Sequence, residues 1–230
     1  LDEDRVVSVV LVTLIAAVFG ARLLYVLEHL SQFRREWTSV LATWQGGLTL
    51  YGGIVAGTFA GLVAAKRMRL PVWITADALT PSLALGTMFG RIGCFLNGCC
   101  YGRPTQLPWG VVFPRDSFAY LEFGDQPVHP SQLYNALAGL MIFVLFHSLR
   151  RRFRVPGVMF WTFIVLFALV RIPLDLTGSY EADAVILGGG VADITESQLM
   201  SLGLVFFGLL MILRLRRNAS HHTTPAPALP

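Results

Sequence analysis

The chain alternates long apolar stretches with short polar segments rich in glycine, proline or arginine. A bilayer core of about 30 Å needs roughly 20 apolar residues in one helix. Six stretches reach or approach that length, at residues 6–26, 48–65, 74–96, 132–149, 157–174 and 198–213. The pattern predicts an all-α, polytopic helical membrane protein with about six spans.

Composition agrees with lipid as the solvent. Hydrophobic residues make up 54% of the chain and charged residues only 14%, whereas soluble domains carry roughly 25% charged residues. The formal charge of +4 is concentrated in short clusters between apolar runs. We therefore expect no nucleic-acid partner, since that function needs basic side chains gathered on an exposed face.

Basic clusters at residues 66–69, 150–154 and 214–217 follow every second apolar stretch. If the spans alternate, all three clusters lie on one side, which the positive-inside rule makes cytoplasmic. Residues 1–217 then form the membrane-embedded domain, and loop 97–130 forms a small external cap. The Ala-, Pro-, Thr- and His-rich residues 218–230 are expected to be a disordered cytoplasmic tail.

Ionisable residues inside apolar spans cost roughly 2.5–3.5 kcal/mol each on insertion scales and mark candidate functional sites. Asp77 falls at the cytoplasmic end of its span, whereas Arg22, Arg91 and Arg171 fall in the outer half of theirs. Arg22 has an alternative role in snorkelling to headgroups, and Arg171 has one in pairing with Asp175 at i, i+4. Converging guanidinium groups at this depth would form a site for a lipid phosphate.

Other polar residues have two interpretations each. Tyr51 is either an interfacial anchor or a hydroxyl of the site, and His129 is either a solvated loop residue or a proton acceptor beside the phosphate. Cys94, Cys99 and Cys100 allow one disulfide in an oxidising compartment. Without a nearby histidine they make a poor zinc site, so we expect no metal and no cofactor.

Residues 90–103, Gly-Arg-Ile-Gly-Cys-Phe-Leu-Asn-Gly-Cys-Cys-Tyr-Gly-Arg, resemble the sequence motif of the bacterial prolipoprotein diacylglyceryl transferases. Residues 20–26, 44–53, 129–134, 170–175 and 195–199 resemble further family motifs in the family's order, so the resemblance covers about residues 15–215. The family has seven spans, with its C-terminus inside. The resemblance implies that a first span precedes Leu1, where the acidic start is unlike a signal peptide.

The resemblance also implies an activity. The family moves the diacylglyceryl group of phosphatidylglycerol to the lipobox cysteine thiol of a preprolipoprotein and releases glycerol phosphate. The protein would be a multi-pass monomer of the bacterial cytoplasmic (inner) membrane, with its active site toward the outer leaflet and its C-terminus in the cytoplasm. The implied catalytic residues are Arg91, Arg171, Tyr51 and His129. The implied substrate-binding residues are Arg22, Gly93, Asn97, Gly102, Gln132, Tyr134 and Asp175.

The chain departs from the family pattern at several acid/base positions. Tyr51 stands where many members carry a histidine, Cys99 and Asn135 stand where glutamate is common, Cys94 replaces an asparagine, and Asp175 replaces a glutamate. These changes keep the arginines and leave an alternative function, that of a non-catalytic phospholipid- or lipoprotein-binding paralogue. A small transporter is disfavoured, because transporters carry midplane sites and internal repeats, and no repeat is visible.

Overall fold

The computed structural model describes residues 1–33, 37–41, 46–178, 185–187 and 194–221. They form two compact units, Leu1–Thr75 and Ala76–Pro230, which are described separately. Among the described residues the long elements are all helices, and the strands are one antiparallel pair, β1 (Val185–Leu187) and β2 (Ile194–Thr195). This confirms the predicted polytopic helical class.

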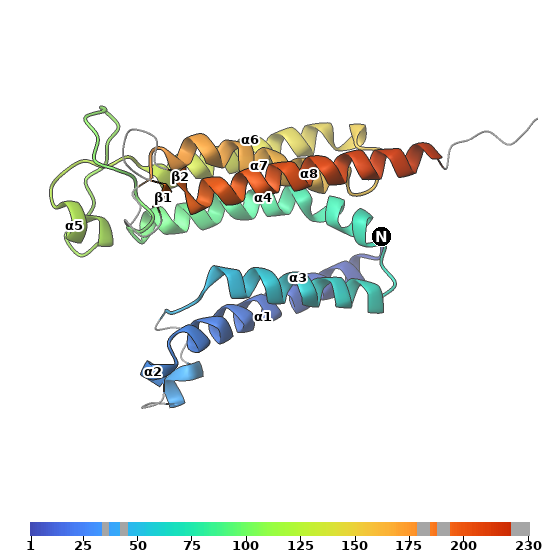
Figure 1. Ribbon diagram of the computed structural model, residues 1–230, viewed down its shortest axis with the longest axis horizontal. Coiled ribbons are helices and arrows are strands. Elements are labelled where there is room, and N and C mark those ends of the chain that lie inside the picture. The colour runs from blue at the N-terminus through green and yellow to red at the C-terminus, as the bar shows by residue number, and fades with distance from the viewer. Residues whose placement is uncertain (34–36, 42–45, 179–184, 188–193, 222–230) are drawn as a thin grey trace, which may run out of the picture. The chain divides into compact units, whose positions relative to one another are not determined.

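All six predicted helices form (Figure 1). They are α1 (Glu3–Glu28), α3 (Leu50–Arg67), α4 (Val72–Leu96), α6 (Ser131–Leu149), α7 (Val158–Asp175) and α8 (Glu196–His221). The short elements are α2 (Leu30–Phe33), α5 (Phe118–Phe123), and two 3₁₀ turns, η1 (Trp37–Leu41) and η3 (Arg150–Arg152).

Five of the six long helices are long and apolar enough to cross a membrane, and α3 is not among them. Its 18 residues include four glycines and end in Lys66 and Arg67, which lower its mean hydropathy. At the other end of the chain, α8 continues to His221, past residue 217, where the membrane domain was expected to end. The Pro-rich remainder of the predicted tail lies outside the described residues.

The N-terminal unit is a hairpin of α1 and α3 whose backbones approach closely through small residues. A Cβ on Gly52 would meet the carbonyl oxygen of Gly20, and one on Gly57 would lie 3.0 Å from the Cβ of Ala17. Such small residues are typical of tightly packed membrane helices.

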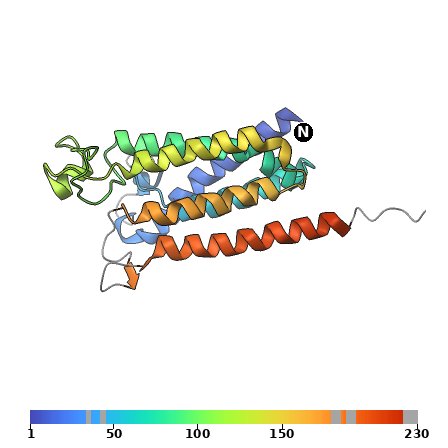
Figure 2. The same ribbon diagram turned by 90° about the horizontal axis from the view of Figure 1, so that it is seen from above.

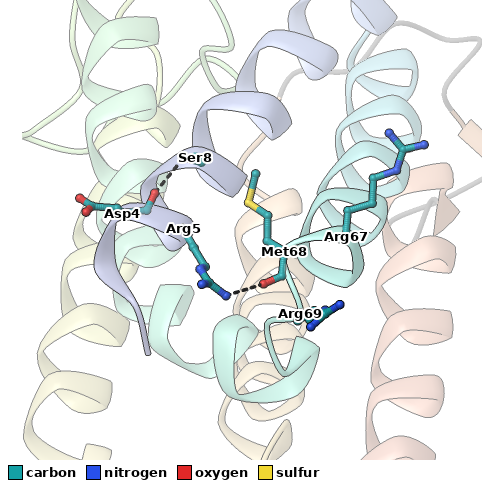
Figure 3. A pocket seen from close by; sticks show the side chains of 6 residues that line it. All are labelled: Asp4, Arg5, Ser8, Arg67, Met68 and Arg69. Carbon is teal, nitrogen blue, oxygen red and sulfur yellow. Dashed lines mark hydrogen bonds between the residues drawn. The ribbon is translucent and has the colours of Figure 1, made fainter.

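At one end of this hairpin, Arg5 Nη1 donates to the carbonyl of Met68 at 3.2 Å. Figure 3 shows this bond beside a cavity of about 420 Å³, which is lined by Asp4, Arg5, Ser8, Arg67, Met68 and Arg69. Arg5 also pairs with Asp2 at 3.0 Å, so part of the basic charge around this cavity is neutralised from within the same helix end.

The C-terminal unit is built on α4, α6, α7 and α8. Helix α7 contacts both α6 and α8, and Figure 2 shows α8 alongside α7. Gly139 of α6 lets that helix approach Ala84 and Met88 of α4. The buried core comprises Ala84, Ile142, Phe146, Met159 and Phe163.

Asp77 joins α4 to the start of α7. The N-cap of α7 is Gly157, which has no side chain to bond the free N–H groups of the first turn. Asp77 supplies the missing acceptors instead, because its Oδ2 accepts from Gly157 N at 2.7 Å and its Oδ1 accepts from Phe160 N at 2.8 Å. A capping box satisfies the same two donors, at N-cap and N3, from within its own helix, so Asp77 caps α7 from a neighbouring helix.

Residues 97–130 fold around a small core of their own beside the C-terminal end of α4. Phe113, Ala119 and Val128 are buried there. Backbone bridges pair Val128 with both Pro104 and Val111. These contacts hold an ordered layer over the end of the helix that carries Arg91.

Candidate functional site

A cavity of about 280 Å³ in the C-terminal unit brings together three of the predicted site residues, Arg91, Arg171 and Asp175. The rest of its lining is Cys100, Tyr101, Ser131, Asn135, Leu174 and Gly178. Helix α4 supplies Arg91, α6 supplies Ser131 and Asn135, and the C-terminal turn of α7 supplies Arg171 to Asp175. Residues far apart in the sequence therefore meet where these helices end.

Arg171 is held in place by two contacts through one nitrogen. Its Nε donates to Ser197 Oγ at 3.0 Å and lies 3.5 Å from Asp175 Oδ1. The i, i+4 pair considered as an alternative is therefore present, and Asp175 is buried. Both contacts use Nε, and the two terminal nitrogens of the guanidinium make no hydrogen bond or ion pair with the residues that the structure describes.

Arg91 is the less constrained of the two cations. It is partly buried, and it makes no hydrogen bond or ion pair with any residue that the structure describes. A guanidinium half-withdrawn from water without a protein partner is costly and offers its planar fork of donors to an anion. The cavity thus holds one arginine fixed by protein contacts and one available to a ligand.

The wall of the cavity beside Arg91 carries two weakly acidic groups. Partial burial of the sulfur raises the pKa of Cys100 to about 12; the neighbouring Cys99 and Cys94 act in the same direction, and Arg91 opposes them. Burial also raises the pKa of Tyr101 to about 12, aided by the hydrogen bond that its hydroxyl donates to Glu122. Both groups stay neutral at physiological pH, so the arginines dominate the charge of the cavity.

His129 does not line this cavity. Its Nδ1 lies 3.2 Å from the hydroxyl of Tyr134, which accepts a hydrogen bond from Trp109 Nε1 at 2.8 Å. The backbone of His129 bonds to Gly102 and Arg103. The structure thus places His129 and Tyr134 in one hydrogen-bonded group, and the catalytic role of His129 stays a prediction.

Gln132 and Gly102 shape the wall rather than line it. Gln132 is fully buried and its Nε2 donates to the carbonyl of Cys99 at 2.7 Å. Gly102 is packed so closely that a Cβ would lie 2.6 Å from that of His129 and would also meet Ser131 Oγ. Both residues fix the chain between Cys99 and Arg103.

Two other predicted residues lie elsewhere in this unit. Asn97 lines a separate cavity of about 470 Å³, which also includes Phe95, Val111 and Phe113. Gly93 is exposed and lines neither cavity. Their substrate-binding roles remain predictions.

Arg22 and Tyr51 belong to the N-terminal unit. The guanidinium of Arg22 is buried and donates to the backbone carbonyls of Ser39, Val40, Gly46 and Gly47. These bonds tie the segment between α1 and α3 to the end of α1, so the structure gives Arg22 a scaffolding role. Tyr51 is 51% exposed at the start of α3.

Sequence reasoning did not single out Ser131 and Tyr101 as residues of the cavity. Ser131 follows His129 and Pro130 at the start of α6 and bonds through its hydroxyl to Thr177 Oγ1 at 3.1 Å. Its place in a family motif was a signal that it serves the site. Tyr101 lies within the motif at residues 90–103, but only the fold shows that it lines the same cavity as Arg91.

Comparison with known proteins identifies the family. The profile described as "Prolipoprotein diacylglyceryl transferase" matches residues 1–214. The chain belongs to this family. Proteins named phosphatidylglycerol–prolipoprotein diacylglyceryl transferase resemble it over most of their length. The one from Geobacter sulfurreducens is 34% identical over 220 residues, which cover 95% of this chain and 81% of the relative. The one from Synechococcus elongatus is 32% identical over 235 residues, covering 98% and 79%.

Membership of the prolipoprotein diacylglyceryl transferase family agrees with the resemblance of the motif segments. The matched range also includes Tyr51, Cys99 and Asn135.

Proposed function

We propose that this protein transfers the diacylglyceryl group of phosphatidylglycerol to the thiol of a lipobox cysteine in a preprolipoprotein. The observation that carries the proposal is Arg91, a cation without a described protein partner, in a cavity that it shares with Arg171. The relatives named above act on these two substrates according to their names.

The phosphate of the lipid is the ligand that suits this cavity. Arg91 and Arg171 present guanidinium groups, which bind phosphate oxygens through paired N–H donors. Asp175 fixes the orientation of Arg171 through the pair at 3.5 Å. The neutral Cys100 and Tyr101 add no negative charge that would repel the ligand.

The transfer step needs a thiolate, and the substrate brings it. The sulfur attacks the glyceryl carbon that bears the phosphodiester, a C–S bond forms, the C–O bond to phosphate breaks, and glycerol phosphate leaves. Negative charge grows on the leaving phosphate, where Arg91 and Arg171 stabilise it. The thiol proton goes to a base, for which His129 and Tyr51 are our candidates.

The proposal includes an orientation in the membrane. The basic clusters at residues 66–69, 150–154 and 214–217 face the cytoplasm, as does the C-terminus. The cavity at the opposite end of α4 and α7 then faces the outer leaflet, where an exported preprolipoprotein and phosphatidylglycerol meet. We propose that one chain suffices, as a monomer.

The test is turnover by purified protein in detergent or liposomes with phosphatidylglycerol and a lipobox peptide. Arg91→Ala is expected to lower the rate about 10²–10³-fold, the usual loss for a group that stabilises developing charge. Arg91→Lys keeps the positive charge but loses the paired N–H donors of the guanidinium. Its rate should lie between those of the wild type and Arg91→Ala. The matched control is Arg115→Ala, because Arg115 is exposed and lines no described cavity.

Turnover by Arg91→Ala within twofold of the Arg115→Ala control would remove Arg91 from the mechanism. Phosphatidylglycerol binding without any thioether product in the wild-type protein would refute the transfer and leave the binding function. The relatives reported above are all named as transferases, and none favours that binding-only alternative.

A further inference from the structure

The C-terminal end of α4 is a turn that brings cysteines together. Gly98 adopts a left-handed conformation, with φ of +66°. The N–H of Cys99 donates to the carbonyl of Cys94, and the N–H of Gly98 donates to that of Phe95, both at 3.1 Å. This is the Schellman pattern, in which the second residue after the helix packs against the residue three places before its cap. Here that contact, commonly hydrophobic, falls between the thiols of Cys99 and Cys94.

Cys100 joins the cluster because its backbone adopts an unusual conformation. Its φ is +58°, a left-handed conformation that is strained for a non-glycine residue and persists only where the surroundings impose it. Gln132 holds the turn from α6 through its bond to the Cys99 carbonyl. The result is a distance of 3.9 Å between the sulfurs of Cys99 and Cys100, and all three sulfurs lie within 4.8 Å of one another.

These distances are those of ligands that share one ion. Metal–sulfur bonds measure about 2.3 Å, so three sulfurs in a plane around one ion are about 4 Å apart. Zinc in a structural site takes four ligands, and among the described residues the cluster offers three. Soft thiolate ligands select soft ions such as Cu(I), for which three sulfurs suffice.

We propose that Cys94, Cys99 and Cys100 form a three-thiolate site for one soft, thiophilic metal ion of the Cu(I) class. Cys100 also lines the cavity of Arg91, so the metal site adjoins the transfer site, but its thiols are not the nucleophile of the transfer step, which the substrate supplies. Three thiolates around a monovalent ion carry net negative charge, and Arg91, whose charge acts on Cys100, offsets part of it. Cys100 is exposed, whereas the other two thiols are half-buried, so an ion reaches the cluster from the side of Cys100.

The site is tested by anaerobic titration of the reduced, full-length protein in detergent with Cu(I), in competition with a chromophoric Cu(I) chelator. We expect one tightly bound Cu(I) per chain. Replacement of an outer-shell partner alone commonly weakens metal binding 10–100-fold. Each of Cys94→Ser, Cys99→Ser and Cys100→Ser should therefore weaken binding at least about 10-fold.

Two control variants remove other soft or nitrogen ligands. Met141→Leu changes an exposed thioether on α6, and the double variant His221→Asn, His222→Asn removes the adjacent histidines of the C-terminal end. Both should bind Cu(I) as the wild type does. X-ray absorption of the wild-type complex needs no variant and should show three sulfur neighbours at about 2.3 Å.

Several results would overturn the proposal. One is equal Cu(I) affinity in the wild type and the cysteine variants, with helix content by circular dichroism unchanged. Another is zinc binding as tight as Cu(I) binding. A third is a disulfide between two of these cysteines in protein purified without reductant, seen as a mass lower by two hydrogen atoms, that resists reduction. Such a bond would consume two of the three ligands.

Discussion

Replacement of Asp77 should destabilise the protein while leaving its chemistry intact. The carboxylate accepts hydrogen bonds from the backbone N–H groups of Gly157 and Phe160 at 2.7 and 2.8 Å. Gly157 has no side chain to replace it as the cap of α7. Asp77→Ala therefore leaves two donors at a helix start without their acceptor and breaks a link between α4 and α7.

The magnitude follows from these two bonds. A hydrogen bond to a charged group contributes about 1.5–3 kcal/mol, and loss of a helix N-cap costs about 0.5–2 kcal/mol. Because the two estimates describe the same contacts and do not add, we expect Asp77→Ala to lower the free energy of unfolding by about 2–4 kcal/mol. Asp77→Asn keeps one acceptor oxygen and should cost about half as much.

The assay is unfolding of the purified protein in mixed micelles by increasing denaturing detergent, followed by circular dichroism. Asp125→Ala is the matched control, because Asp125 is an exposed carboxylate and surface changes stay within about 0.5 kcal/mol. The reasoning would be refuted if Asp77→Ala matched Asp125→Ala, or if Asp77→Asn were as unstable as Asp77→Ala.

A second measurement separates structure from function. Asp77 and Arg91 lie 14 residues apart on α4, which at 1.5 Å per residue is about 21 Å along the helix. Folded Asp77→Asn protein should therefore keep near-normal turnover. A loss like that expected for Arg91→Ala, in protein that remains folded, would mean that Asp77 has a catalytic role that its contacts do not reveal.

Three further results are expected. The phenol of Tyr101 should keep its proton until about pH 12. In a titration followed by tyrosinate absorbance, Glu122→Gln should lower that pKa only in part, since burial is the larger cause of its rise. An unchanged titration would contradict the role of the hydrogen bond. The pKa of Cys100, raised from 9.0 to about 12, makes its thiolate roughly 10³-fold scarcer at pH 8 than that of an ordinary thiol. Its alkylation, located by fragment mass spectrometry, should be correspondingly slow and should quicken with every pH unit. Gly52→Ala should destabilise the α1–α3 hairpin by about 1–3 kcal/mol through overpacking. Gly53→Ala should cost less, because its Cβ would lie 3.2 Å from its nearest neighbour. Equal unfolding midpoints for the two variants would show that the helices separate at little cost.

The helices could be predicted because their signal is local. Apolar stretches predicted all six, with boundaries within three residues of the structure, except that α8 continues to His221, eight residues past the predicted end at residue 213. The exception is α3, which was predicted as a span but is less apolar than the other five helices. Its hydropathy is lowered by glycines that allow close packing against α1 and by Lys66 and Arg67 at its end.

The cavity could be predicted only in part, because it depends on which helix ends meet. Arg91, Arg171 and Asp175 were expected together and do line one cavity. The motif alone could not show whether the His129 ring faces the cavity or Tyr134, and its catalytic role stays a prediction. The three-thiol turn also depends on tertiary contacts, because Gln132 of α6 supports the backbone that brings Cys100 back toward Cys99.

Asp77 and Arg91 show why charge within a span is not by itself a functional signal. Both are ionisable residues of α4, and insertion into lipid costs a comparable amount for each. Asp77 recovers that cost from two backbone donors of α7, so its presence is explained by stability alone. Arg91 makes no hydrogen bond or ion pair with the described residues, and we propose that an anion bound in the cavity offsets its cost. The distinction between a structural and a binding charge thus lies in the partners, which are set by the fold and not by the position of the charge in the sequence.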